Sequence, residues 1–237
     1  MLFRSTAFNK PPTTQTNGQA LVNVTQLAQQ AQQLQSLLSE KISDTRANEI
    51  MNRIRTQGGG GPGRGGQPGG GATTRNFNSI AELYKATGMT LEEMALIEDQ
   101  LSDLNSQTPQ CKVNVNTASE VVLACIPGLD RDKAASLGTY RQSNASKLNS
   151  VGWVAEVLDD QALAQAGRYL TARSYQFTAD IAAVGHHGRG YRRNRIVFDT
   201  RSGLPKILYR QDMSYSGWAL GDKTRLQLQQ LASNTIR

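Results

Sequence analysis

Residues 113–141 read VNVNTASEVVLACIPGLDRDKAASLGTYR, and this stretch decides the fold of the middle of the chain. Thr117 and Glu120 have the spacing of a capping box, so a helix is expected to start near residue 118. Pro127 and Gly128 end that helix in a tight turn, and a second helix is expected to begin near Asp130. The stretch therefore predicts a helix-hairpin-helix.

A helix-hairpin-helix can bind DNA or serve as a packing module. A hairpin that binds DNA offers free backbone amides at the start of its second helix to a phosphate. Here Asp130 stands where such a hairpin has its second glycine, and Asp132 follows in the first turn. These carboxylates suit the helix dipole but repel a phosphate. We therefore favour the packing module, with a DNA-binding protein of the competence type as the alternative.

Working outward, two more capping boxes lie upstream of the hairpin. Ser79 with Glu82 and Thr90 with Glu93 predict helix starts near residues 80 and 91, and Gly88 is expected to end the first of these helices. Apolar residues at helical spacing predict two further helices, one from about residue 25 and one over 44–55. A last helix is expected over 153–170.

The hydrophobic period changes after residue 174. Apolar side chains alternate over residues 175–183, which is strand spacing, and residues 195–199 and 206–210 are also expected to be strands. Turns at 185–190 and 201–203 would connect the three as an antiparallel meander. The fold class is therefore α+β, with an antiparallel sheet and a large helical part.

A glycine-rich run, GGGGPGRGGQPGGG at residues 58–71, marks a flexible linker. With this linker, the patterns divide the chain into five parts. They are an N-terminal helical part (1–57), the linker (58–76), a helical domain with the hairpin (77–170), a β-meander (171–221) and a polar tail (222–237).

The net charge of +7 is uneven, with +5 over residues 1–77, −6 over 78–167 and +8 over 168–237. The acidic middle argues against a uniform surface for a polyanion. No catalytic motif or metal-ligand spacing appears, and His186 and His187 are expected to be turn residues. We therefore expect no catalytic residue, no metal site and no cofactor. A basic hairpin is expected, either solvated or facing an acidic protein partner, with the arginines Arg189, Arg192, Arg193 and Arg195.

The two cysteines, Cys111 and Cys125, do not form a metal-binding pair. They are expected to form one disulfide in an oxidising compartment, which their separation allows, or else to be two buried thiols.

An ordered set of motifs resembles the type II (general) secretion pathway protein K family of minor pseudopilins. The set begins with residues 79–83 and 88–90 and continues through the hairpin to strand residues near 174–177, 208–210 and 217–218. The hairpin residues that match the family motif are Asn114, Asn116, Thr117, Ala118, Ser119, Pro127, Gly128 and Leu129.

The resemblance implies a pseudopilin-like sheet with a large helical insertion, in a protein that is not an enzyme. It implies a place at the tip of the pseudopilus, on the periplasmic face of the inner membrane, where the chain would help protein secretion. The implied partners are other minor pseudopilins and secretion-system components, and nucleic acid is not expected.

Two features depart from the family. The apolar N-terminal helix, which would be the membrane contact, is absent from these residues, and no run approaches the roughly 18–20 apolar residues that span a bilayer. Family members also often carry an acidic stretch linked to calcium, and here the glycine-rich run takes its place. We therefore do not expect a calcium site.

Overall fold

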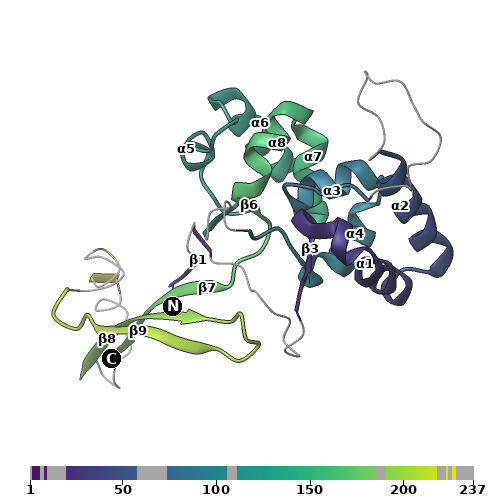
Figure 1. Ribbon diagram of the computed structural model, residues 1–237. Helices are drawn as coiled ribbons and strands as arrows, with labels where there is room; N and C mark the ends of the chain where they lie inside the picture. The colour runs from purple at the N-terminus through teal and green to yellow at the C-terminus, as the bar shows by residue number, and fades with distance from the viewer. Residues whose placement is uncertain are drawn as a thin grey trace. The chain divides into compact units, whose positions relative to one another are not determined.

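The computed structural model describes residues 2–5, 8–9, 20–57, 74–105, 111–184 and 190–217, with 223 and 226–227 (Figure 1). The chain forms two compact units. The sheet unit contains Met1–Thr6 and Tyr175–Arg237, and the helical unit is Ala7–Ser174. An antiparallel sheet in one unit and helices in the other confirm the expected α+β class.

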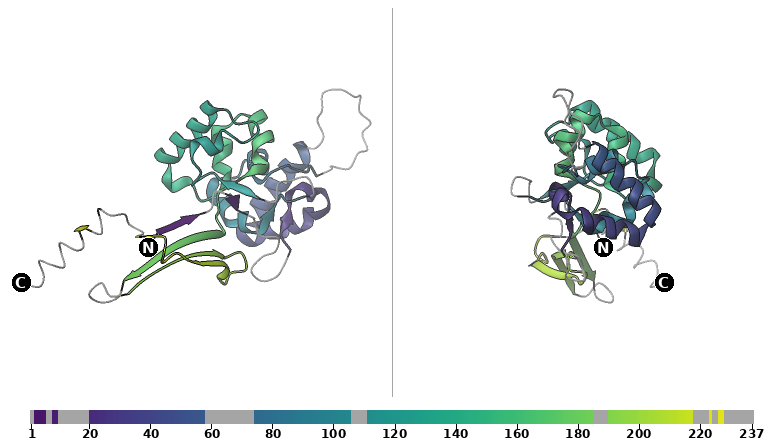
Figure 2. Two further views of the ribbon diagram at one scale, coloured as in Figure 1. Left: turned by 90° about the vertical axis from the view of Figure 1, so that its left-hand side faces the viewer. Right: turned by 45° about the vertical axis from the view of Figure 1, so that its right-hand side comes forward.

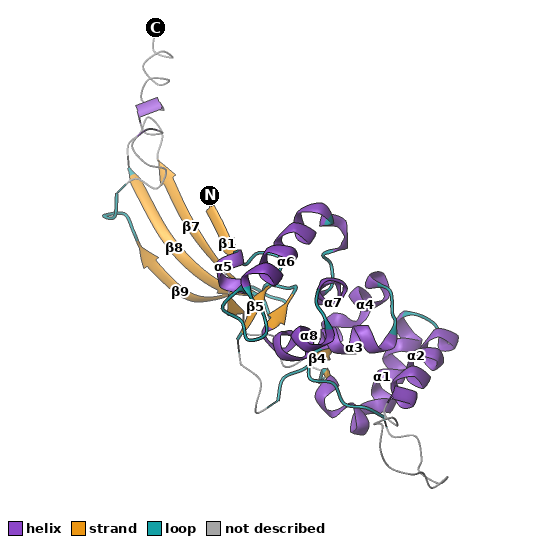
Figure 3. Cartoon of the chain, turned by 90° about the horizontal axis from the view of Figure 1, so that it is seen from above, coloured by secondary structure: helices purple, strands orange, loops and turns teal. Residues whose placement is uncertain are grey.

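The sheet unit holds four antiparallel strands in the order β1-β7-β8-β9 (Figure 3). The expected meander is present as β7 (Gln176–Val184), β8 (Tyr191–Asp199) and β9 (Lys206–Asp212). Strand β1 (Leu2–Ser5) was not expected, and it pairs with β7 along one edge of the sheet. Strand β9 forms the other edge.

The meander of the sheet unit buries few apolar side chains. Ala179 is the one buried apolar side chain among residues 175–184 and 190–217, although Phe177 and Phe198 stack across β7 and β8 with ring centroids 5.5 Å apart. The alternation over 175–183 thus predicted the strand correctly, but it did not show that most of these side chains stay half-buried or exposed.

The first core of the helical unit joins residues on both sides of the glycine-rich run. Helices α1 (Leu27–Lys41) and α2 (Asp44–Gln57) pack with α3 (Ile80–Thr87) and α4 (Leu91–Ile97), as Figures 1 and 2 show. The separate N-terminal part expected over 1–57 is therefore corrected. Its helices belong to the helical unit because their apolar faces share one core with α3 and α4.

Helix caps follow the sequence prediction closely in this region. The Ser79 hydroxyl accepts a hydrogen bond from the Glu82 amide, and Thr90 with Glu93 forms a complete capping box. Gly88 ends α3 with a φ of 61°, a conformation that glycine adopts without steric cost. Arg46 of α2 donates to the Glu93 carboxylate and to the Gly88 carbonyl, and so ties α2 to this turn.

The second core surrounds the hairpin. It includes α5 (Glu120–Leu123), α6 (Arg131–Ser143), α7 (Val154–Val157) and α8 (Asp160–Ala166). The single helix expected over 153–170 is wrong. Leu158 is extended between α7 and α8, and the Asp159 carboxylate caps α8 by accepting from the Ala162 amide at 2.7 Å.

Short strands and 3-10 turns complete the helical unit. Strand β5 (Lys112–Asn114) lies between β2 (Phe8–Asn9) and β6 (Leu170–Thr171), and β3 (Val22–Asn23) pairs with β4 (Leu101–Ser102). The 3-10 turns are η1 (Val24–Gln26), η2 (Glu98–Gln100), η3 (Ala145–Lys147), η4 (Val151–Trp153) and η5 (Gly167–Tyr169).

Some sequence predictions lie outside the described residues. These are the glycine run at 58–71, the histidine turn at 185–189 and most of the tail at 222–237. Within the described ranges, no helix has both the length and the apolar character needed to span a bilayer.

If α1 and α2 belong to the same cooperative unit as the hairpin, a cavity in the first core should also destabilise the second. Ile50 of α2 is fully buried, and Ile80 and Tyr84 contact both cores. We expect Ile50→Ala to lower the free energy of unfolding by about 3 kcal/mol. Fluorescence of Trp153 in the second core, followed during urea unfolding in a Trp218→Phe background, measures this.

The matched control is Leu96→Ala, because Leu96 is 56% exposed on α4. It should change the unfolding free energy by less than about 0.5 kcal/mol. A Trp153 transition that Ile50→Ala leaves unchanged would show that the N-terminal helices form a separate domain.

Candidate functional site

The motif residues of the hairpin are held by an asparagine pair at the end of β5. The Asn114 side chain accepts from the Asn116 amide at 2.8 Å and donates to the Ser174 hydroxyl at 2.7 Å. The Asn114 carbonyl accepts from the amides of Thr117 and Ala118. These bonds form a turn that carries the chain from β5 into α5.

Asn116 joins three other segments through its side-chain amide. Its nitrogen donates to the carbonyls of Leu148 and Ala172 at 2.9 and 3.1 Å, and its oxygen accepts from the indole nitrogen of Trp153 at 3.0 Å. Trp153 is fully buried. Asn116 therefore satisfies a donor that has no access to water.

The first helix of the hairpin starts two residues later than expected. Ser119, not Thr117, is the N-cap residue, and its hydroxyl accepts from the Val122 amide. The reason is the turn at Asn114, which uses the Thr117 and Ala118 amides before the helix begins. From α6, Arg141 donates to the carbonyls of Val115 and Ala118 and closes the turn from the other side.

The hairpin turn is packed tightly against α8. Gly128 has a φ of 86°, and a Cβ atom there would lie 2.7 Å from the Cβ of Gln165. The next residue, Leu129, is buried in the second core. The Pro127, Gly128 and Leu129 motif is thus the turn and anchor of the hairpin, as its residue types predict.

The N-terminus of α6 is already occupied by a carboxylate. The Asp130 side chain accepts from the Lys133 amide at 2.7 Å, in the place where a phosphate would bind a DNA-binding hairpin. The Lys133 ammonium lies 3.5 Å from Asp159 and 3.8 Å from Asp130. The Asp130 carboxylate therefore takes the Lys133 amide, one of the groups that a phosphate would need at this terminus.

Three buried charged groups of the helical unit were not identified from the sequence. Lys112 and Asp103 form an ion pair with distances of 2.5 and 2.6 Å, and both side chains are almost fully buried. Glu98 is 7% exposed and accepts from the Val151 amide at 3.0 Å. Burial raises the pKa of Glu98 to about 7. No local pattern in the sequence marks these residues as buried, because Lys112 and Asp103 pair across nine residues and Glu98 meets Val151 across 53.

A second cluster that was not identified from the sequence surrounds the Glu156 carboxylate. Tyr84 and Tyr140 donate to its two oxygens at 3.3 and 2.5 Å, and the Tyr140 ring stacks on Trp153. Burial, followed by the nearby carboxylate, raises the pKa of each tyrosine to about 12. Both hydroxyls therefore stay protonated at neutral pH and act as structural donors, with no role as a base.

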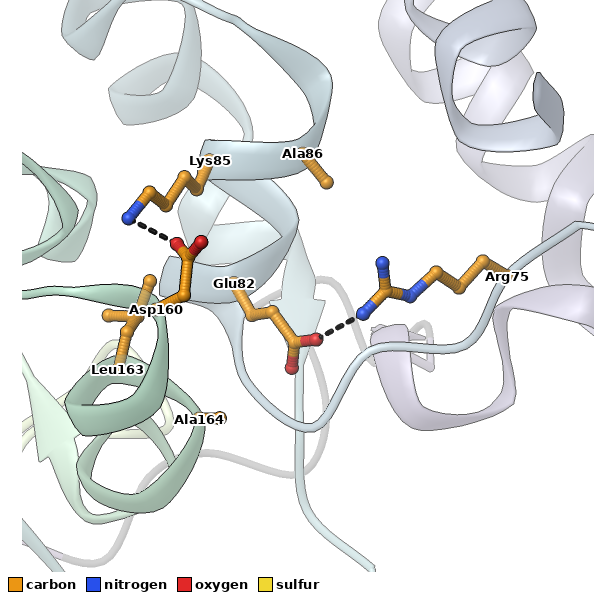
Figure 4. A pocket seen from close by; sticks show the side chains of 7 residues that line it. All are labelled: Arg75, Glu82, Lys85, Ala86, Asp160, Leu163 and Ala164. Atoms are coloured by element: carbon orange, nitrogen blue, oxygen red, sulfur yellow. Dashed lines mark hydrogen bonds and ion pairs between the residues drawn. The ribbon is translucent and has the colours of Figure 1, made fainter. Parts of the chain in front are cut away.

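A notch of about 370 Å³ lies between α3 and α8. Figure 4 shows that its charged side chains are engaged with one another: Lys85 with Asp160 at 2.5 Å, and Arg75 with Glu82 at 2.9 Å. Ala86, Leu163 and Ala164 complete the lining. Because each charge has a partner of opposite sign, the notch offers no unbalanced charge to a ligand.

The structure differs from both alternatives expected for the cysteines, a disulfide and two buried thiols. Cys111 and Cys125 are free thiols in the structure and both are exposed, so they form neither a disulfide nor a buried pair. The Cys125 sulfur lies 3.2 Å from the Val121 carbonyl, one turn back along the chain.

Most arginines of the expected basic hairpin are paired with acids of the sheet unit. Arg193 binds both oxygens of Asp180 at 2.8 Å and holds the pKa of that carboxyl below its usual range. Arg195 lies 3.5 Å from Asp180, and Arg192 pairs with Asp212 at 3.2 Å. Arg189 lies outside the described residues. Part of the basic character expected on this hairpin is thus neutralised within the sheet.

The described residues contain no group of three or more acidic, histidine or cysteine side chains that could hold a metal ion. The arrangement of the hairpin is that of a packed scaffold: the motif residues bond to backbone groups and to a buried indole.

Of the comparisons with known proteins, the one with solved structures found a similarity. No family model matches the chain, and no curated protein matches it. Among solved structures, it aligns with a chain from the crystal structure of the GspK-GspI-GspJ complex of the type 2 secretion system from enterotoxigenic Escherichia coli. The two are 15% identical, the alignment covers 89% of this chain and 78% of that chain, and the TM-score is 0.29. A TM-score and an identity this low establish neither a shared fold nor a function.

Replacing Asn116 should test whether the hairpin depends on its amide. We expect Asn116→Leu to lower the free energy of unfolding by about 3 kcal/mol, because it leaves the buried Trp153 indole N–H without an acceptor. Urea unfolding followed by circular dichroism measures this. Asn149→Leu is the control, since Asn149 is exposed with a single long bond. Equal effects of the two substitutions would contradict the assigned role.

Glu98 should make the helical unit less stable as pH rises. Its pKa is raised on folding, so the folded state binds more protons than the unfolded state between about pH 4.5 and 7. The unfolding free energy should fall by on the order of 3 kcal/mol across this window and level off above it. Glu98→Gln should remove that fall. Denaturant unfolding at pH 5 and pH 8 measures both, and an unchanged pH slope in the variant would refute the assignment.

Proposed function

We propose that the chain is a non-enzymatic minor pseudopilin of type II secretion that caps the tip of the pseudopilus. In this role it faces the periplasm and assembles with other minor pseudopilins to assist protein secretion. The observation that carries the proposal is the structural role of the motif on which the family resemblance rests. Asn114, Asn116 and Ser119 bond to backbone groups, buried side chains and a helix terminus.

The sheet unit supports a role in assembly. Seven of the nine large apolar side chains that are exposed among the described residues belong to this unit, although it buries only one described apolar side chain itself. Exposed apolar surface on this scale is typical of a protein that binds other proteins. Arginines paired with acids on the same sheet leave a mixed polar rim around the apolar side chains.

The helical unit supports a cap. It has two packed cores, side-chain caps on α3, α4, α5, α6 and α8, and buried charges that are paired or hydrogen-bonded, all of which suit a rigid body. A bulky helical part in the same chain as the sheet would limit the stacking of a further subunit. The prediction is a chain that joins a filament tip but does not form filaments itself.

Assembly can be tested with the soluble domains of the other two minor pseudopilins, of the kinds in the GspK-GspI-GspJ complex. We expect the chain to sediment alone as a monomer and to form a discrete complex when both domains are added. Analytical ultracentrifugation measures both states. Regular fibres formed by the chain alone, or no association with either domain at micromolar concentrations, would contradict the proposal.

The DNA-binding alternative is tested on the hairpin. We expect the chain to give no stable complex with a duplex of about 20 base pairs at physiological salt, because Asp130 occupies the anion position. The double change Asp130→Gly with Asp132→Asn should add weak binding that disappears as salt is raised. A gel-shift titration at two salt concentrations measures this. Tight binding by the unaltered chain would favour the alternative.

A further inference from the structure

Strand β9 has the most exposed backbone and side chains of the sheet unit's three long strands. All seven of its residues are exposed, including Ile207, Leu208 and Tyr209, which are 48–61% exposed. It lies at the end of the sheet order, with a strand on one side only. A long apolar edge strand of this kind is a template for pairing with another strand.

The backbone register shows which groups of β9 face outward. The Met213 amide donates to the Arg193 carbonyl at 2.7 Å, so this pair faces β8. Because inward and outward residues alternate along an antiparallel ladder, the backbone groups of Arg210 and Asp212 face away from β8. These groups can be satisfied by water or by a further strand, but not by β8.

The charges around this edge indicate the character of such a strand. Residues 175–184 and 190–217 carry six basic and three acidic side chains. Each acid, Asp180, Asp199 and Asp212, already pairs with an arginine. Lys206 and Arg210, both on β9, have no acidic partner among the described residues. The edge is therefore complementary to a strand that presents acidic side chains.

A second copy of β9 fits this edge poorly. Antiparallel pairing centred on Leu208 would place Lys206 opposite Arg210 of the copy, and like charges directly opposite are destabilising. Pairing centred on Gln211, which uses the outward groups of both copies, would place Arg210 opposite Asp212, which Arg192 already holds at 3.2 Å. The residues 218–237 that follow the sheet carry a net charge of +2 and are no better matched.

We infer that β9 binds an extended segment of a partner protein, in which acidic residues alternate with apolar ones, as a fifth strand of the sheet. The outward groups of Arg210 and Asp212 bond to the backbone of that segment. Its acids lie against Lys206 and Arg210, and its apolar residues cover part of the exposed apolar row. This surface does not require the partner to be a pseudopilin. The inference is therefore independent of the proposed secretion role.

The test uses the full chain and two blocked ten-residue peptides, one alternating glutamate with valine and the other alternating lysine with valine. Fluorescence anisotropy gives the affinities, and amide hydrogen exchange locates the site. We expect only the acidic peptide to bind, with protection gained at residues 206–212. Arg210→Glu should weaken binding on the order of tenfold, because it turns a cross-strand attraction into a repulsion. Arg210→Pro should abolish binding, because it also removes an outward N–H.

The matched control is Arg131→Glu, an exposed cation on α6 of the helical unit, and it should change the affinity by less than about twofold. Retained exchange protection across β7 and β8 shows that each variant keeps its sheet. Four results would overturn the inference: no binding of the acidic peptide, equal binding of both peptides, protection outside β9, or protection of β9 by dimerisation without peptide. Displacement of the acidic peptide by duplex DNA at physiological salt would also overturn it, by assigning the edge to nucleic acid.

Discussion

The side-chain amide of Asn116 is the interaction on which the hairpin module depends. It joins the start of the hairpin to the segments at Leu148 and Ala172 and accepts from the buried indole of Trp153. A hydrophobic side chain of similar size could fill the space but could not meet these three polar groups, and an unmet buried donor costs more than a hydrogen bond contributes. The packing of α6, α7 and η4 therefore relies on a residue that lies in a turn.

The same logic explains how one structural unit can serve two unrelated purposes. A helix N-terminus carries unsatisfied amides, which can bind a phosphate or a carboxylate from the chain itself. Here Asp130 supplies the carboxylate, and the capped helix becomes a packing element against α8. The choice between DNA binding and packing thus rests on the residue after the hairpin turn. That residue can be recognised in the sequence.

Local signals predicted local structure well. The capping boxes at Ser79 and Thr90, the glycine at 88 and the alternation over 175–183 each predicted an element that the structure contains. The helix start near 118 was wrong by two residues because a side-chain turn at Asn114 competes with the helix for the same amides. Of the candidate site, the sequence therefore predicted the hairpin and its closed N-terminus. The three-way role of Asn116 could not be predicted because its partners lie 32–56 residues away along the chain.

Long-range pairing accounts for the other differences between the sequence predictions and the structure. The glycine-rich run suggested a boundary, yet α1 and α2 share a core with α3 and α4, which follow it in the sequence. A longer connection adds little to the free-energy cost of bringing packed elements together. Strand β1 joins β7 from the far end of the chain, and Glu98, Asp103 and Lys112 are buried by segments that no local pattern identifies. Such contacts depend on which surfaces remain uncovered after local structure forms.

The two units differ in how many of their apolar side chains are buried. The helical unit has two cores, and its buried charged side chains have hydrogen-bond or ion-pair partners within the unit. It therefore has few unsatisfied polar groups that could bind a partner. The sheet unit has long ladders but one described buried apolar side chain, and its apolar residues remain at the surface. Ladder hydrogen bonds give a sheet its shape, whereas apolar burial supplies most of its stability. A sheet built in this way would gain stability from a partner that covers it, and the proposed association would then be coupled to the folding of the sheet.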